Sequence, residues 1–128
     1  MIPKFRAWLK EEQRMVDVRE MTFMYDEVYL ISDVTGFYAY EEFKLMQFTG
    51  LKDKNGKEIF EGEVVKYEVG RNTYTEEVAY DKNFAGFGVK DAKANVVFTF
   101  GEIRLMSSAI SLEVIGNIYE NPGLLEGE

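Results

Sequence analysis

Hydrophobic and polar side chains alternate along much of this 128-residue chain. The clearest run covers residues 63–69, where Val65, Tyr67 and Val69 share one side and Lys66 and Glu68 share the other. A repeat of two residues is typical of a half-buried strand. Similar runs predict strands over residues 2–9, 14–18, 21–25, 28–32, 37–40, 74–80, 84–89, 96–100 and 110–119. Short runs spaced so closely indicate a mainly β protein.

The strongest local turn signal is the segment Asp53, Lys54, Asn55 and Gly56. An aspartate side chain accepts a hydrogen bond from the backbone two residues on, and glycine tolerates a positive φ. The segment therefore predicts a type I turn followed by a left-handed glycine. A calcium loop is the alternative, but it needs oxygen ligands at alternate positions and glycine sixth. Because the spacing differs and Lys54 and Lys57 occupy the loop, a structural turn is favoured.

A second turn is predicted at Gly62, just before the long strand, and a third at residues 70–73. Pairing Val69 with Tyr74 across the third turn groups most apolar side chains on one face, which is what fixes a register. This register also sets Glu76 opposite Tyr67 on the more apolar face, which is a weakness of the prediction.

Two glycines, Gly86 and Gly88, interrupt the run at residues 84–89. Glycines inside a strand indicate a bend, a bulge or a close approach of another backbone. A phosphate-binding loop would need a following helix and usually a lysine, and no helical pattern follows. A structural role in a curved sheet is therefore favoured.

Three segments together resemble the YopX family of phage and prophage proteins. They are LMQFTGLKDKNGKEIFEGEVVKY at residues 45–67, PKFRAW at residues 3–8 and LEVIGNIYENP at residues 112–122. The family usually has aspartate where this chain has Leu9, and Gly-Asp where this chain has Gly62 and Glu63. The resemblance implies an SH3-like small β-barrel and a phage or prophage origin. It brings no catalytic residues with it.

The length of the chain predicts a single domain over residues 1–128. Within it we expect an additional N-terminal antiparallel sheet at about residues 1–48, packed on the barrel and sharing its core. The barrel is expected at about residues 49–121. Residues 122–128 are expected to fray, because Pro122 cannot donate to a sheet ladder.

Charge and composition narrow the range of functions. Fifteen basic and twenty-three acidic residues give a net charge of −8, which argues against direct nucleic-acid binding. The same charge leaves open an acidic decoy that blocks a host nucleic-acid-binding protein. The chain has no cysteine, no apolar run near the ~18 residues of a membrane span and no signal-peptide pattern. A cytoplasmic protein without a membrane partner is expected.

The chain has neither histidine nor cysteine. It therefore lacks the commonest general base, the commonest metal ligand and the thiol nucleophile. We expect no enzyme activity, no cofactor and no metal. A carboxylate-dependent hydrolase remains an alternative, since paired carboxylates can support hydrolysis. The candidate pairs are Glu61 with Glu63, Glu41 with Glu42, and Glu76 with Glu77.

The main hypothesis is a non-catalytic binding module that contacts an unknown host or phage protein, with a homo-oligomer left open. Aromatic side chains are enriched at protein interfaces. The expected binding surface comprises Trp8, Tyr38, Tyr40 and Tyr67. For Trp8 the favoured alternative is a ring covered by the stems of neighbouring cationic side chains, because tryptophan is highly buried on average.

Overall fold

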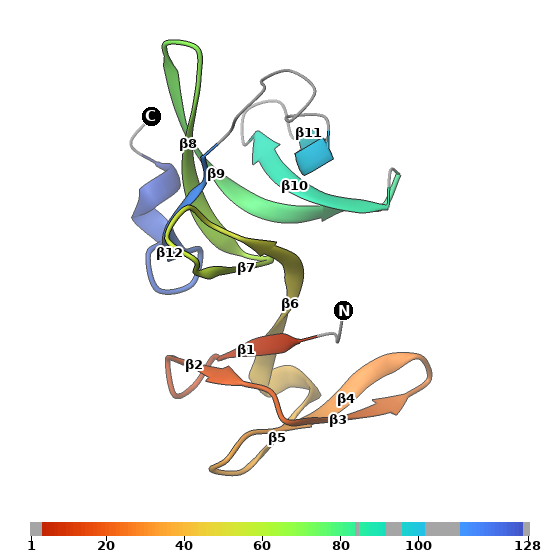
Figure 1. Cartoon of the computed structure of the whole chain (residues 1–128). Helices are drawn as coiled ribbons and strands as arrows, with labels where there is room; N and C mark the ends of the chain where they lie inside the picture. Colours follow the sequence, from red (N-terminus) through yellow and green to blue (C-terminus); the bar gives the residue numbers. More distant parts are fainter. Residues whose placement is uncertain (1–3, 84, 92–95, 102–110, 127–128) are drawn as a thin grey trace. The chain divides into compact units, whose positions relative to one another are not determined.

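The computed structural model describes residues 4–83, 85–91, 96–101 and 111–126 (Figure 1). Predicted strand positions at residues 2, 3, 84 and 110 lie outside this part. The chain divides into two compact units, unit 1 (Met1–Phe48) and unit 2 (Thr49–Glu128). A single domain was expected from length. The division falls where the N-terminal sheet was expected to end, and the packing of that sheet on a barrel stays a prediction.

Unit 1 consists of short antiparallel strands that enclose one core. Its elements are β1 (Phe5–Leu9), β2 (Arg14–Asp17), β3 (Glu20–Met24), β4 (Glu27–Ser32), β5 (Phe37–Ala39), the 3₁₀ helix η1 (Tyr40–Glu42) and β6 (Phe43–Lys52), which continues into unit 2. One sheet has the order β2-β1-β6, and the other has the order β3-β4-β5. The buried core comprises Ala7, Leu9, Val16, Ile31 and Phe43. The predicted strands of this half are therefore confirmed, with boundaries shifted by one or two residues.

A bulge in β4 sets the faces of the three-stranded sheet. The register runs Thr22 with Leu30 and then Phe23 with Val28, so that Tyr29 is the extra residue. Because of the bulge, both Val28 and Ile31 pack toward the core although they are three positions apart. Cross-strand partners share a face, so Phe23 lies on the same side of the sheet as Val28.

Unit 2 is a curled, half-barrel antiparallel sheet with the order β11-β10-β9-β8-β12 (Figure 1). Its strands are β8 (Glu63–Val69), β9 (Asn72–Asp81), β10 (Gly86–Asp91), β11 (Val96–Thr99) and β12 (Glu113–Asn117). The short strand β7 (Glu58–Phe60) pairs with β6. The buried core comprises Ile59, Val65, Tyr67, Val78, Val89 and Phe100. The chain is thus mainly β, as predicted.

The predicted register of the long hairpin is wrong by two residues. Tyr67 pairs with Tyr74 and Val65 with Glu76. The turn is shorter than expected, with Gly70 (φ +62°) at the first of two central positions, where a type II′ turn takes glycine. The face of each side chain is unchanged. The Tyr67 hydroxyl donates a hydrogen bond to the Glu76 carboxylate, so the acidic side chain on the apolar face has a partner.

The predicted structural turn at residues 53–56 is confirmed, since Gly56 has φ +82°. Oδ1 of Asp53 accepts hydrogen bonds from the backbone N–H groups of Asn55 (2.8 Å) and Lys57 (2.9 Å). Its Oδ2 accepts one from Val114 in β12 (3.0 Å). The Asp53 side chain is therefore a buried anchor of the fold.

The second turn also matches the prediction, with φ +87° at Gly62. Glu63, which replaces the aspartate that the family usually has, is buried and accepts a hydrogen bond from the Phe60 backbone N–H (2.7 Å). The longer side chain therefore still satisfies a buried backbone donor, and the departure from the family pattern leaves the turn intact.

Two glycines in unit 2 allow close packing. A Cβ at Gly88 would lie 2.0 Å from the carbonyl oxygen of Phe98, so the predicted close backbone approach is found between β10 and β11.

A Cβ at Gly116 would lie 2.8 Å from the Leu124 side chain. Leu124 belongs to the 3₁₀ helix η2 (Pro122–Leu125), which forms where fraying was expected. Leu124 thus packs close to Gly116, and residues 127 and 128 of the expected tail lie outside the described residues.

Candidate binding surface

Two of the four residues expected to form a binding surface are buried. Trp8 is 6% exposed and Tyr67 is 7% exposed. The Tyr67 ring stacks on Tyr74 with 5.4 Å between ring centroids, and burial together with the Glu76 hydrogen bond raises the pKa of Tyr67. The alternation of apolar and polar residues places each side chain on one face of its strand, and in the structure other side chains cover that face. Both side chains are therefore largely covered, although Tyr67 contributes to the lining of a hollow in unit 2.

The other two residues lie in unit 1 and differ in exposure. Tyr38 is half-buried, and its hydroxyl accepts a hydrogen bond from Arg14 Nη2 (3.0 Å) and lies 3.2 Å from the Thr35 hydroxyl. Tyr40 is 54% exposed. Of the four candidates, Tyr40 is therefore the one that the structure presents to solvent.

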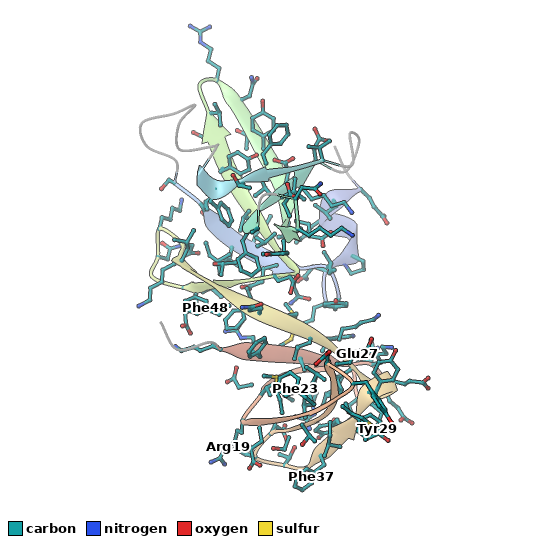
Figure 2. The ribbon with its side chains drawn as sticks, turned by 90° about the vertical axis from the view of Figure 1, so that its right-hand side faces the viewer. Arg19, Phe23, Glu27, Tyr29, Phe37 and Phe48 are labelled. Atoms are coloured by element: carbon teal, nitrogen blue, oxygen red, sulfur yellow. The ribbon has the colours of Figure 1, made fainter. Side chains whose placement is uncertain are left out.

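Further large apolar side chains are exposed in the segment of the chain that contains Tyr40. Seven of the twelve exposed large hydrophobic side chains of the described residues fall between positions 23 and 40. They are Phe23, Met24, Tyr25, Tyr29, Val34, Phe37 and Tyr40, here called the β3–β5 surface. Figure 2 labels Phe23, Tyr29 and Phe37, which leave unit 1 at separate points along the three-stranded sheet. Exposed apolar side chains are common singly, but such a concentration indicates an interaction site.

The tip of the β3–β4 hairpin carries a second unusual feature. Tyr25 and Asp26 have φ values of +52° and +64°, and Tyr25 is 93% exposed. Positive φ at both central positions is the type I′ pattern, which favours asparagine and glycine. A left-handed residue with a Cβ costs roughly 1–2 kcal/mol. Strained residues of this kind cluster at functional sites, and here the strain places an aromatic ring at the hairpin tip.

A groove of about 640 Å³ adjoins the β3–β5 surface. Apolar side chains of Val28, Phe43 and Leu45 line it, together with Tyr40. Four charged side chains complete its lining: Lys10, Glu27, Glu41 and Lys44. Phe23 is the cross-strand partner of Val28, one of the lining residues.

The hairpin from β3 to β4 is acidic. Its charged side chains, Glu20, Asp26 and Glu27, are exposed and form no ion pair with any residue that the structure describes. Elsewhere in unit 1, Arg14 contacts both Glu12 (2.9 Å) and Asp33 (3.8 Å). The hairpin therefore combines exposed apolar side chains with three carboxylates that form no ion pair with the described residues, close to the exposed Arg19 in sequence and, at Glu27, to Lys10 and Lys44 in the groove lining.

A second hollow, of about 440 Å³, lies in unit 2 and has a mostly polar lining. Lys54 Nζ and a carboxylate oxygen of Glu113, 2.8 Å apart, form an ion pair beside it. The exposed large apolar side chains of unit 2 are fewer, and none of Leu51, Tyr74, Tyr80, Val96 and Phe98 lines this hollow. It therefore offers less to a partner than the surface of unit 1.

Two of the carboxylates considered as candidates for hydrolysis accept hydrogen bonds within the fold. Glu63 accepts from the Phe60 N–H, and Glu76 accepts from the Tyr67 hydroxyl. The pKa of the Glu77 carboxyl lies above its ordinary value. Burial is the main cause; the positive charge of Lys90 opposes the shift, and the negative charge of Glu61 adds to it. Across the ranges described above, no cluster of three or more acidic side chains could hold a metal ion.

Within those ranges there is also no helix of the length and apolar character needed to cross a bilayer.

Fold and surface together define a mainly β protein with two compact units. A family model described as YopX protein matches residues 4–126, and the chain belongs to the YopX family. The crystal structure of protein EF1440 from Enterococcus faecalis is similar, with 32% sequence identity and a TM-score of 0.70, over 98% of this chain and 99% of that chain. No curated protein matches the chain.

Proposed function

We propose that this protein is a non-catalytic binding module and that it contacts a partner protein through the β3–β5 surface. The observation that carries the proposal is the concentration of exposed aromatic and apolar side chains between positions 23 and 40. Small β domains commonly bind partners at sheet edges and in aromatic-lined grooves. Large aromatic side chains also supply most of the strong contacts at interfaces.

The setting of this function is part of the proposal. The resemblance to phage and prophage proteins supports an accessory role in the cytoplasm of a bacterial host. The curled sheet of unit 2 is proposed to be an SH3-like barrel, supported by its five antiparallel strands and by the close approach at Gly88. An experimental structure in which β7 does not help to close that sheet would refute the barrel.

The two alternatives have less support. A decoy needs its acidic side chains concentrated on one region, but residues 1–48 hold nine acidic and six basic residues, and residues 49–128 hold fourteen and nine. A hydrolase needs two carboxylates free to act in one cleft. Of the pairs named from the sequence, Glu63 and Glu76 are engaged by a backbone N–H and by a tyrosine hydroxyl. Glu27 and Glu41 do line the groove of unit 1, together with Lys10 and Lys44.

The test is affinity capture from host lysate with three forms of the full chain. The first is the wild type, and the second carries Phe23→Ser, Tyr29→Ser and Phe37→Ser on the β3–β5 surface. The matched control carries Leu51→Ser, Val96→Ser and Phe98→Ser, which remove exposed apolar side chains from unit 2.

We expect a protein that the wild type and the control capture and that the β3–β5 variant loses. A protein captured equally by both variants would contradict the choice of surface. If the wild type captures nothing above background, the binding function itself is wrong. Circular dichroism of each variant establishes that the comparison involves folded proteins.

A further inference from the structure

Strand β3 is an edge of its sheet. The order β3-β4-β5 gives β3 a single neighbour, and among the described residues no other strand pairs with it. The outward-pointing backbone N–H and C=O groups of Glu20–Met24 are therefore available for hydrogen bonds. Such an edge is a template on which another extended chain can pair.

β3 has few of the usual protections of an edge. Proteins blunt edge strands with charged side chains, above all lysine, with proline or with a bulge in the edge strand itself. The charged residue of β3 is Glu20, at its start. The sequence of β3, EMTFM, contains neither lysine nor proline. The bulge of this hairpin lies in β4, at Tyr29. Phe23 (62% exposed) and Met24 (47% exposed) therefore flank an open edge with apolar side chains.

The charges around β3 select among extended chains. Glu20, Asp26 and Glu27 are the acidic residues of the hairpin, and none has an ion pair within the described part of the chain. With Arg19, which directly precedes β3, residues 19–32 carry a net charge of −2, and Lys10 and Lys44 line the groove with Glu27. A strand with basic side chains would place positive charge against them, which favours association and fixes its register. A second copy of this protein would instead bring acidic hairpins together, and each copy carries a net charge of −8.

We propose that β3 binds an extended segment of a partner protein in which apolar and basic side chains alternate, and that this segment adds a strand to the β3-β4-β5 sheet. This inference rests on the proposed function, because it names the kind of partner for the same surface. Apolar side chains of the segment would pack beside Phe23, and its basic side chains would lie near Asp26 and Glu27. Backbone hydrogen bonds supply affinity in this mode, while alternate side chains supply specificity.

The experiment measures binding of labelled peptides to the full chain by fluorescence anisotropy. The probe is a peptide of about eight residues that alternates valine and lysine, which is the length of an ordinary strand. A second peptide replaces lysine with glutamate. A third keeps lysine but carries N-methyl groups on alternate amides, which removes the donors needed for strand pairing.

We expect the lysine peptide to bind, more weakly at high salt, and the glutamate peptide not to bind. N-methylation should weaken binding about ten-fold. The variant Asp26→Asn with Glu27→Gln should weaken it about ten-fold as well. The matched control, Glu11→Gln with Glu42→Gln, removes the same charge from exposed positions outside the hairpin and should bind like the wild type.

Three results would overturn the inference. They are equal loss in the variant and the control, equal binding of the N-methylated peptide, and absence of binding by the lysine peptide. Concentration-dependent self-association that the hairpin variant abolishes would also overturn it, because the occupant would then be a second copy. If lysate capture depends on the β3–β5 surface while the lysine peptide does not bind, the binding function stands and only this inference fails.

Discussion

Asp53 Oδ2 accepts a hydrogen bond at 3.0 Å from the backbone N–H of Val114, a residue 61 positions further along the chain. The other oxygen of the same carboxylate holds the N–H groups of Asn55 and Lys57. A turn that looks local in the sequence is therefore tied to the last strand. The buried carboxylate serves as a common acceptor for two parts of unit 2 that are distant in sequence.

Replacing Asp53 with alanine should lower the free energy of unfolding by about 3 kcal/mol, since it leaves three partly buried backbone donors without their acceptor. Asp53→Asn should cost less, because one carbonyl oxygen remains. Asp81→Ala is the control, since Asp81 accepts one such bond, from the Asn83 N–H (2.9 Å), and should cost under about 1 kcal/mol. Urea denaturation measures all three. Equal losses for Asp53→Ala and Asp81→Ala would contradict the anchoring role.

The stability of the protein should fall in acid partly because of Asp53. Burial raises the pKa of this carboxyl, but the N–H donors of Val114, Lys57 and Asn55 outweigh it, and the pKa lies below its ordinary value. The ionised form is thus favoured in the folded state. Its contribution is complete above the unfolded pKa, about 3.9, and is lost as the pH falls through the lower folded pKa. Unfolding free energies measured from pH 6 down to about pH 2 should fall less steeply for Asp53→Asn than for the wild type.

The left-handed conformation of Gly56 predicts a graded response to substitution. Gly56→Ala should destabilise the fold by roughly 1–2 kcal/mol, and Gly56→Asn by less, because asparagine tolerates positive φ better. No atom lies within 4 Å of the new Cβ, so backbone strain alone is tested. Gly36→Ala is the matched control, since Gly36 does not have a positive φ. Thermal melts in which alanine and asparagine are equivalent at position 56 would refute this account.

Gly88 should tolerate substitution less than Gly56 although its φ is not positive. A Cβ there meets the backbone of Phe98 at 2.0 Å, and a backbone atom cannot rotate away as a side chain can. Gly88→Ala should therefore destabilise the protein by about 3 kcal/mol and loosen the pairing of β10 with β11. Gly123→Ala, where a Cβ meets nothing within 4 Å, is the control. Hydrogen exchange of β11 that is unchanged in Gly88→Ala would argue against the close contact.

Calcium should not stabilise the protein through the central turn. Both carboxylate oxygens of Asp53 already accept backbone hydrogen bonds, and the spacing of oxygen ligands in the turn does not match a calcium loop. Melting curves with about 1 mM calcium and with chelator should superimpose, since a ligand stabilises only the state that binds it. An upward shift with calcium that Asp53→Ala abolishes would show that this interpretation of the turn is wrong.

Local turn chemistry could be predicted from the sequence, because the residues that form the turn at Asp53 are adjacent. The register of the β8–β9 hairpin could not. A two-residue and a four-residue turn at Gly70 leave every side chain on the same face, so the alternation of apolar residues does not separate them. Tyr67 and Glu76, which the predicted register sets directly opposite each other, are diagonal neighbours in the structure and are joined by a hydrogen bond.

The candidate site was harder to predict than the fold. All four candidates rest on the enrichment of aromatic side chains at interfaces, which does not separate covered rings from exposed ones. The structure shows Trp8 and Tyr67 covered, as the average burial of tryptophan favours for Trp8, and Tyr40 exposed. The tip residue Tyr25 was missed because tyrosine is not favoured in a type I′ turn, and residues 21–25 read as strand. A tyrosine followed by aspartate between two apolar runs was the available signal.

The place of β12 in the sheet has a consequence for how the protein is made. Strand β8 lies between β9 and β12, although β12 is the last strand in sequence. While the ribosome is synthesising the chain, β8 and β9 can pair as soon as they emerge, but the other edge of β8 stays open until residues 113–117 have followed. Nascent chains with unpaired edges are prone to aggregate and to engage chaperones. Ribosome stalling just before β12 should therefore give a chain that binds chaperones more strongly than the finished protein does.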